Sequence, residues 1–165
     1  MEPTGTLTGL SEVALALAGF TAIVLALGTR ANALNADILS YVRIIVSNAV
    51  GSTVLCLFAI AILALELSPP FVWVVLSGMA LVGTVAGSTL NFFLFLRQLE
   101  RRASGEALFW WSFVGVSCAL HLVNALGLFP PPSFGLFFLG LVVLLSQAAL
   151  QFIFLVYSLL ARSAA

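Results

Sequence analysis

The chain contains no lysine, and arginine supplies all six of its basic side chains. This absence excludes a Schiff-base lysine, including one that would hold retinal, and it excludes the lysine of a phosphate-binding P-loop. Histidine and aspartate occur once each, as His121 and Asp37. A single histidine excludes the two-histidine motif of intramembrane metalloproteases and a haem held by two histidines, and a single aspartate excludes an aspartyl pair.

Other reactive side chains are also scarce. The two cysteines, Cys56 and Cys118, both lie within apolar runs, where cysteine resembles a small hydrophobic residue more than half of a disulfide or a metal site. Ser117 precedes His121 by one helical turn, but no oriented acid and no serine-hydrolase motif accompany the pair. The sequence therefore predicts a protein that is not an enzyme and that holds no cofactor and no metal.

Charged residues are also scarce. Charged residues make up 7% of the chain, hydrophobic residues make up 62%, and the mean hydropathy is +1.22. A soluble domain is only about half apolar, so this composition indicates an integral membrane protein. Six arginines balance six acidic residues, and the formal net charge of zero predicts no attraction to nucleic acid.

Long apolar runs give the number of membrane spans. A transmembrane helix needs about twenty apolar residues to cross a hydrocarbon core roughly 30 Å thick. Five stretches meet this requirement, at residues 8–27, 38–67, 70–96, 107–129 and 133–160. Backbone polar groups must be paired inside hydrocarbon, so each stretch is expected to be a helix. We therefore predict an all-α integral membrane helical bundle of five transmembrane helices, in a single membrane domain over residues 1–165.

Arginine predicts the orientation. Two arginines flank the first predicted connection, three crowd the third and one lies in the tail, whereas the second and fourth connections have none: Arg30, Arg43, Arg97, Arg101, Arg102 and Arg162. By the positive-inside rule, the N-terminus is outside and the C-terminus is cytoplasmic. The first stretch follows an acidic tail rather than a basic one, which favours a retained helix over a cleaved signal peptide.

Proline turns separate the helices on the outer side. Pro70 is expected in the first turn of the third helix, Ser133 is expected to cap the fifth, and Asp37 to cap the second. A shift of the chain by 62 residues superposes Cys56 on Cys118, and the prolines of one turn on those of the other. Whether the two proline-turn hairpins are a duplication stays open at this point.

Polar residues recur on one side of each predicted helix. Near the cytoplasmic ends they form an inner polar cluster of Arg43, Ser47, Asn48, Asn91, Gln147 and Gln151. Nearer the outside they form an outer polar cluster of Glu12, His121 and Asn124. Small residues expected at close helix contacts are Gly19, Gly83, Gly87 and Gly140. We expect these faces to point into the bundle, either as hydrogen-bonded packing or as a polar pathway.

The ionisable residues of these clusters each have two interpretations. Glu12, placed near the start of the first helix, is explained either by the helix dipole or by a pair with His121, which would act as a proton switch. His121 is otherwise a hydrogen-bonded histidine of the interior. Arg43 either extends to lipid phosphate or pairs with Asn91 or Gln151.

The opening stretch LSEVALALAGFTAIVLALG, with a short arginine-bearing loop after it and a later proline turn leading into FVWVVLSG, resembles a group of small, uncharacterised bacterial membrane proteins. The resemblance is specific over the first thirty residues. It implies a multi-pass protein of the bacterial inner membrane with a retained first helix. It implies no function and no catalytic residue.

Two functions are compatible with these features. The first is a non-enzymatic membrane protein that works through helix–helix assembly with itself, as a homo-oligomer, or with a membrane-protein partner in the lipid bilayer. The alternative is a channel or transporter whose polar pathway follows the inward faces. A cavity that joins the two polar clusters would favour the alternative, and tightly packed faces would favour assembly.

Overall fold

The chain forms five helices in the computed structural model, which describes residues 2–30, 36–96, 104–128 and 131–163. They are α1 (Pro3–Arg30), α2 (Ala36–Leu63), α3 (Pro69–Leu96), α4 (Ser104–Ala125) and α5 (Phe134–Ser163). Within these described ranges there is no strand, and each helix contains a stretch long and apolar enough to cross a membrane. The prediction of an all-α bundle of five helices, each long and apolar enough to cross a membrane, is confirmed, and these helices indicate a multi-pass membrane protein.

Proline ends α2 earlier than its hydrophobicity predicts. Apolar residues continue to Leu67, but α2 ends at Leu63, and Glu66 has a positive φ of 53°. The two prolines that follow cannot continue the hydrogen-bonding pattern of α2, so the chain turns before them. Pro69 and Pro70 instead form the first turn of α3, where a missing N–H breaks no intrahelical bond. The predicted position of Pro70 is confirmed.

The turn between α4 and α5 is fixed by a glycine and a serine. Gly127 has a φ of 64° and donates its N–H to the Asn124 carbonyl, and the Leu128 N–H bonds the Val123 carbonyl. This arrangement is a common helix end that favours glycine, so α4 ends at Ala125 rather than at residue 129. Ser133 caps α5 as predicted, with its Oγ 3.5 Å from the Leu136 nitrogen. The predicted cap Asp37 lies in the first turn of α2, but its side chain is outside the described residues.

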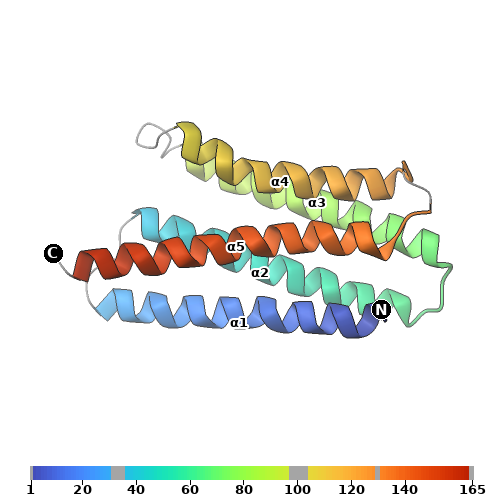
Figure 1. Ribbon diagram of the computed structural model, residues 1–165, viewed down its shortest axis with the longest axis horizontal. Helices are drawn as coiled ribbons and strands as arrows, with labels where there is room; N and C mark the ends of the chain where they lie inside the picture. Colours follow the sequence, from blue (N-terminus) through green and yellow to red (C-terminus); the bar gives the residue numbers. More distant parts are fainter. Residues whose placement is uncertain (1, 31–35, 97–103, 129–130, 164–165) are drawn as a thin grey trace.

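The helices pack around α5, which contacts all four of the others. α1 lies beside α2, and α3 lies beside α4 (Figure 1). α2 and α3 follow one another in the sequence but contact each other over only a small area. We call the end of the bundle that holds the two proline-containing turns the proline end, and the opposite end, where α1 reaches Arg30 and α5 reaches Ser163, the arginine end (Figure 1).

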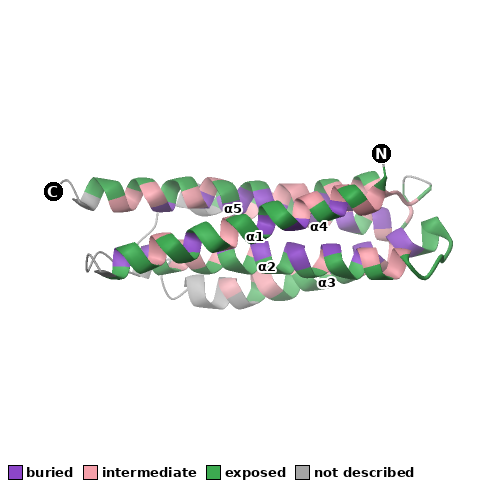
Figure 2. Cartoon of the chain, turned by 90° about the horizontal axis from the view of Figure 1, so that it is seen from below, coloured by how far each residue is buried: buried purple, intermediate pink, exposed green. Residues whose placement is uncertain are grey.

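The proline end is closely packed. Its core contains Leu7, Cys56, Ala59, Val72, Trp73, Leu76, Ala80, Phe137 and Leu141. The Trp73 ring packs against two phenylalanine rings of α5, with centroids 5.3 Å from Phe134 and 5.9 Å from Phe137. Cys56 is a buried free cysteine of this core, as the sequence predicted. Figure 2 shows exposed positions on the outer faces of the helices, and many are large hydrophobic residues, as expected for a lipid-facing surface.

Candidate functional site

A cavity of about 760 Å³ lies toward the arginine end, among α2, α3, α4 and α5. All six residues of the inner polar cluster line it, although they come from three different helices. Further polar and small lining residues are Ser40, Tyr41, Gly51, Ser52, Gly83, Thr84, Gly87, Ser88, Trp110 and Trp111. The structure therefore brings together the residues that helical spacing placed on the inward faces of α2, α3 and α5.

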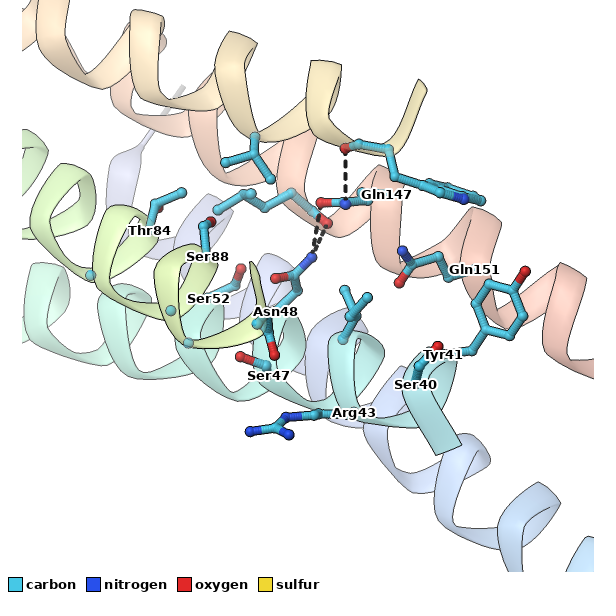
Figure 3. Close-up of a pocket in the computed structure, with 18 of the residues that line it drawn as sticks. Ser40, Tyr41, Arg43, Ser47, Asn48, Ser52, Thr84, Ser88, Gln147 and Gln151 are labelled. Atoms are coloured by element: carbon cyan, nitrogen blue, oxygen red, sulfur yellow. Dashed lines mark hydrogen bonds between the residues drawn. The ribbon is translucent and has the colours of Figure 1, made fainter. Parts of the chain in front are cut away.

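The floor of the cavity is polar and buried. Ser52, Gln147 and Gln151 are each less than 5% exposed, and Trp110 and Leu144 lie beside them. Asn48 of α2 donates from Nδ2 to Gln147 Oε1 at 3.2 Å and to the Leu144 carbonyl at 3.4 Å. Gln147 in turn donates from Nε2 to the Trp110 carbonyl at 3.2 Å, so this chain of hydrogen bonds connects α2, α5 and α4 (Figure 3).

Two polar atoms of the floor have no partner. The Oε1 atom of Gln151 and the Oγ atom of Ser52 are buried and make no hydrogen bond. Figure 3 shows the Gln151 amide directed from α5 toward the space that Asn48 and Gln147 also face. A buried polar atom without a partner destabilises a structure, and no bulk solvent compensates it at membrane depth. A hydrogen-bonding occupant of the cavity would satisfy these two atoms.

The mouth of the cavity opens sideways, between α2 and α3. The exposed lining residues all belong to these two helices, and they are Leu39, Arg43, Ser47, Gly51, Val54 and Gly83. On α2 they extend from Leu39 to Val54, which corresponds to about 22 Å along the helix axis. An opening of this length on the side of a transmembrane bundle faces the bilayer. We call the cavity together with this mouth the α2–α3 groove.

Three glycines that line the groove face open space. A Cβ atom added to Gly51, Gly83 or Gly87 would meet no heavy atom within 4 Å. The prediction that Gly83 and Gly87 make close helix contacts is therefore wrong for the isolated chain, and it is also wrong for Gly19, which is exposed on α1. A small residue permits either a close contact or an open space, and the sequence does not distinguish them.

The groove carries positive charge. Arg43 is the only charged side chain among the described residues that line it, and no carboxylate lies among them. Ala14, Ala49 and Leu145 pack together, and Ala49 is the fourteenth of the 28 residues of α2, so this contact marks the mid-depth of the bundle. Arg43 lies six residues from that level, about 9 Å toward the arginine end.

The outer polar cluster does not form as predicted. Asn124 is completely buried and bonds the Ser77 hydroxyl and the Ser133 backbone rather than Glu12. His121 is also completely buried, with both ring nitrogens unpartnered, and its ring lies 5.7 Å from that of Phe137. Neither residue lines the groove, so among the described residues this cavity does not reach the outer polar cluster.

Glu12 lies on the exposed face of α1, and the prediction that it faces the interior is wrong. α1 contacts α2 and α5 but not α4, so Glu12 cannot pair with His121. The helix dipole does not explain the carboxylate either, because α1 begins at Pro3 and Glu12 is its tenth residue. Both sides of α1 carry small and polar residues, and the buried side is the one with Leu7, Ser11, Ala14 and Thr21.

Other chemistry finds little support in the described residues. Ser117 is completely buried and donates its hydroxyl to the Gly140 carbonyl at 2.9 Å, so the hydroxyl is not hydrogen-bonded to His121. Among the described residues there is no group of three or more His, Cys, Asp or Glu side chains placed to hold a metal ion.

Sequence reasoning missed one floor residue, Ser52. Ser52 follows Asn48 by one helical turn, so its position was visible in the spacing, although serine alone is a weak signal. Comparison with known family models, with curated proteins and with solved structures finds no match to this chain.

Proposed function

We propose that this chain is a non-enzymatic transport protein that binds a polar or amphiphilic small molecule in the α2–α3 groove. The observation that carries the proposal is the pair of unpartnered buried atoms, Gln151 Oε1 and Ser52 Oγ, on the floor of the cavity. The volume of about 760 Å³ lies in the range typical of small-molecule sites. A polar floor at membrane depth favours an occupant that forms hydrogen bonds.

The groove supports a one-sided binding site more than a continuous pore. Its lining stops short of the closely packed core around Trp73 and Phe137 at the proline end. A transporter that alternates between two access states has one side closed whenever the other is open. In this proposal the arginine end is the open side, and the core at the proline end is the closed gate.

The arginine distribution supports an orientation for the proposed transporter. The positive-inside rule places the arginine end in the cytoplasm and the N-terminus outside. The groove would then open to the inner leaflet and the cytoplasm. Together with the resemblance of the first helix to small bacterial membrane proteins, this orientation supports a location in the bacterial inner membrane.

Filling the mouth of the groove tests the proposed function. Gly51→Leu is expected to abolish retention of the native ligand, because its side chain extends into the mouth from a position with no heavy atom within 4 Å. The measurement is native mass spectrometry of protein purified from its membranes. Gly115→Leu is the matched control, since Gly115 is also exposed and unobstructed but does not line the groove. A ligand that stays bound to the Gly51→Leu protein would refute the proposal.

A second function, assembly through α1, is favoured by the position of Glu12. Glu12 precedes the mid-depth residue Ala14 by two residues, about 3 Å along the axis, and its side chain is exposed. An exposed carboxylate in hydrocarbon costs several kcal/mol unless it is paired. Ala16 and Gly19 lie exposed on the same helix, and small residues permit another helix to approach closely.

Assembly through α1 is tested by substituting its exposed face. Glu12→Leu and Gly19→Leu are each expected to reduce the associated fraction of the protein severalfold, measured by single-molecule photobleaching in lipid vesicles. Val13→Leu is the control, because Val13 is an exposed apolar neighbour on α1. If Glu12→Leu strengthened association or left it unchanged, α1 would be an ordinary lipid-facing helix.

A further inference from the structure

The positive charge of the groove indicates that its ligand is negatively charged. Arg43 lines the mouth and, among the described lining residues, no carboxylate neutralises it. At about 9 Å from mid-depth it lies within the half-thickness of about 15 Å of a typical hydrocarbon core. A guanidinium at that depth is stabilised by an anion, and its planar donors fit the oxygens of a phosphate or carboxylate.

Gln151 on the floor of the cavity lies at the same depth as Arg43 at the mouth. Leu145 of α5 lies at mid-depth with Ala49, and Gln151 follows Leu145 by six residues, again about 9 Å toward the arginine end. Arg43 of α2 and Gln151 of α5, whose Oε1 atom has no partner, are therefore at the same level along the bundle. A ligand head group at this level would meet a cation at the mouth and an unsatisfied acceptor on the floor.

The shape of the mouth indicates what the ligand carries besides its head group. The opening between α2 and α3 runs toward mid-depth as far as Val54 and Gly83, and both residues are exposed. An alkyl chain in this part of the groove would contact apolar lining such as Leu55 and would leave sideways into the bilayer without crossing a polar layer. A soluble ion would leave this part of the groove empty.

We propose that the ligand is an anionic amphiphile, with a phosphate or carboxylate bound by Arg43, a hydroxyl or amide donor bound by Gln151, and an acyl chain leaving between α2 and α3. This assignment rests on the proposed function of the groove and adds the chemistry of its ligand. The free energy of binding is contributed by both ends of the molecule, the head group through Arg43 and the chain through the apolar wall.

The test uses three probes on the delipidated full-length protein in detergent. Oleoyl lysophosphatidylglycerol has the anion, the hydroxyls and the chain, 1-oleoylglycerol has the same chain and hydroxyls without the phosphate, and glycerol phosphate has the head group alone. Binding is measured by intrinsic tryptophan fluorescence, because two of the three tryptophans, Trp110 and Trp111, line the groove. The anionic lysolipid is expected to bind about tenfold more tightly than 1-oleoylglycerol, the loss expected for one charged hydrogen bond.

Substitution of Arg43 separates this assignment from the proposed function. Arg43→Gln is expected to remove the preference for the anionic lysolipid, Arg43→Lys to keep part of it, and Gly51→Leu to abolish binding of both. Equal binding of the lysolipid and 1-oleoylglycerol, with Arg43→Gln neutral and Gly51→Leu still blocking, would overturn the anionic assignment and leave the proposed function standing. If glycerol phosphate bound as tightly as the lysolipid, the acyl chain would contribute nothing, and the proposal that the ligand is an amphiphile would be wrong. If Gly51→Leu left the binding of every probe unchanged, the α2–α3 groove would not be the binding site.

Discussion

Replacement of Gly140 by alanine is expected to destabilise the bundle by about 1–3 kcal/mol, the cost of overpacking a filled interior. A Cβ atom at Gly140 would lie 2.5 Å from His121 Nε2 and 2.6 Å from its Cε1. The imidazole is completely buried and has the Phe137 ring beside it, so it cannot move aside without displacing a second group. The measurement is the thermal unfolding midpoint of the purified protein in detergent.

Two control variants show whether the destabilisation comes from the contact between Gly140 and His121. Gly115→Ala is expected to be neutral or slightly stabilising, because Gly115 has no heavy atom within 4 Å and alanine favours a helix more than glycine does. Gly140→Ala in a His121→Ala background is expected to lose most of its effect, since the obstructing ring is gone. If Gly140→Ala destabilised the His121→Ala protein as much as the wild type, the contact between α4 and α5 would not be the cause.

The fold was predictable because hydrocarbon leaves a chain few alternatives. Five apolar stretches became five helices, and the turn chemistry of Pro70 and Ser133 located two helix starts. The helix ends were less predictable. Leu67 is apolar but lies beyond the end of α2, since the backbone at Glu66 and the prolines that follow decide where that helix stops.

The candidate site was predictable in one half of the bundle and not in the other. The inner polar cluster formed because Arg43, Ser47, Gln147 and Gln151 repeat at helical spacing on helices with one clearly polar side. On α1 small and polar residues occur on both sides, so spacing could not select the side with Ser11 over the side with Glu12. The spacing of residues also does not show which helices contact each other. In the structure α1 does not contact α4.

The structure divides the bundle into two parts with different properties. At the proline end, Asn124 is bonded to the backbone and aromatic rings pack around Trp73, and His121 is a buried side chain there whose ring nitrogens have no partner. At the arginine end, α2 and α3 contact little, and polar atoms such as Gln151 Oε1 remain unpaired. Elements that move or bind are expected where local stability is low, so ligand binding should alter the arginine end first.

Asn124 is the residue whose loss should weaken the proline end most. Its Nδ2 donates to Ser77 Oγ at 2.8 Å and to the Ser133 carbonyl at 3.0 Å, and its Oδ1 accepts from the Ser133 N–H at 2.8 Å. One amide therefore connects α3, α4 and the cap of α5. Hydrogen bonds inside membranes average about 0.6 kcal/mol each, but a buried group left without a partner costs about 1–3 kcal/mol.

Asn124→Leu is accordingly expected to lower the free energy of unfolding by about 2–4 kcal/mol, because it leaves the Ser133 N–H and the Ser77 hydroxyl unpaired together. Ser77→Ala removes only one of the three bonds and should cost less than half as much. Hydrogen exchange at the Ser133 amide distinguishes the two, since the amide should lose protection in Asn124→Leu and keep it in Ser77→Ala. If both proteins kept the Ser133 amide protected, the turn would be held by its proline and glycine backbone rather than by Asn124, and the closed gate of the proposed transporter would need another explanation.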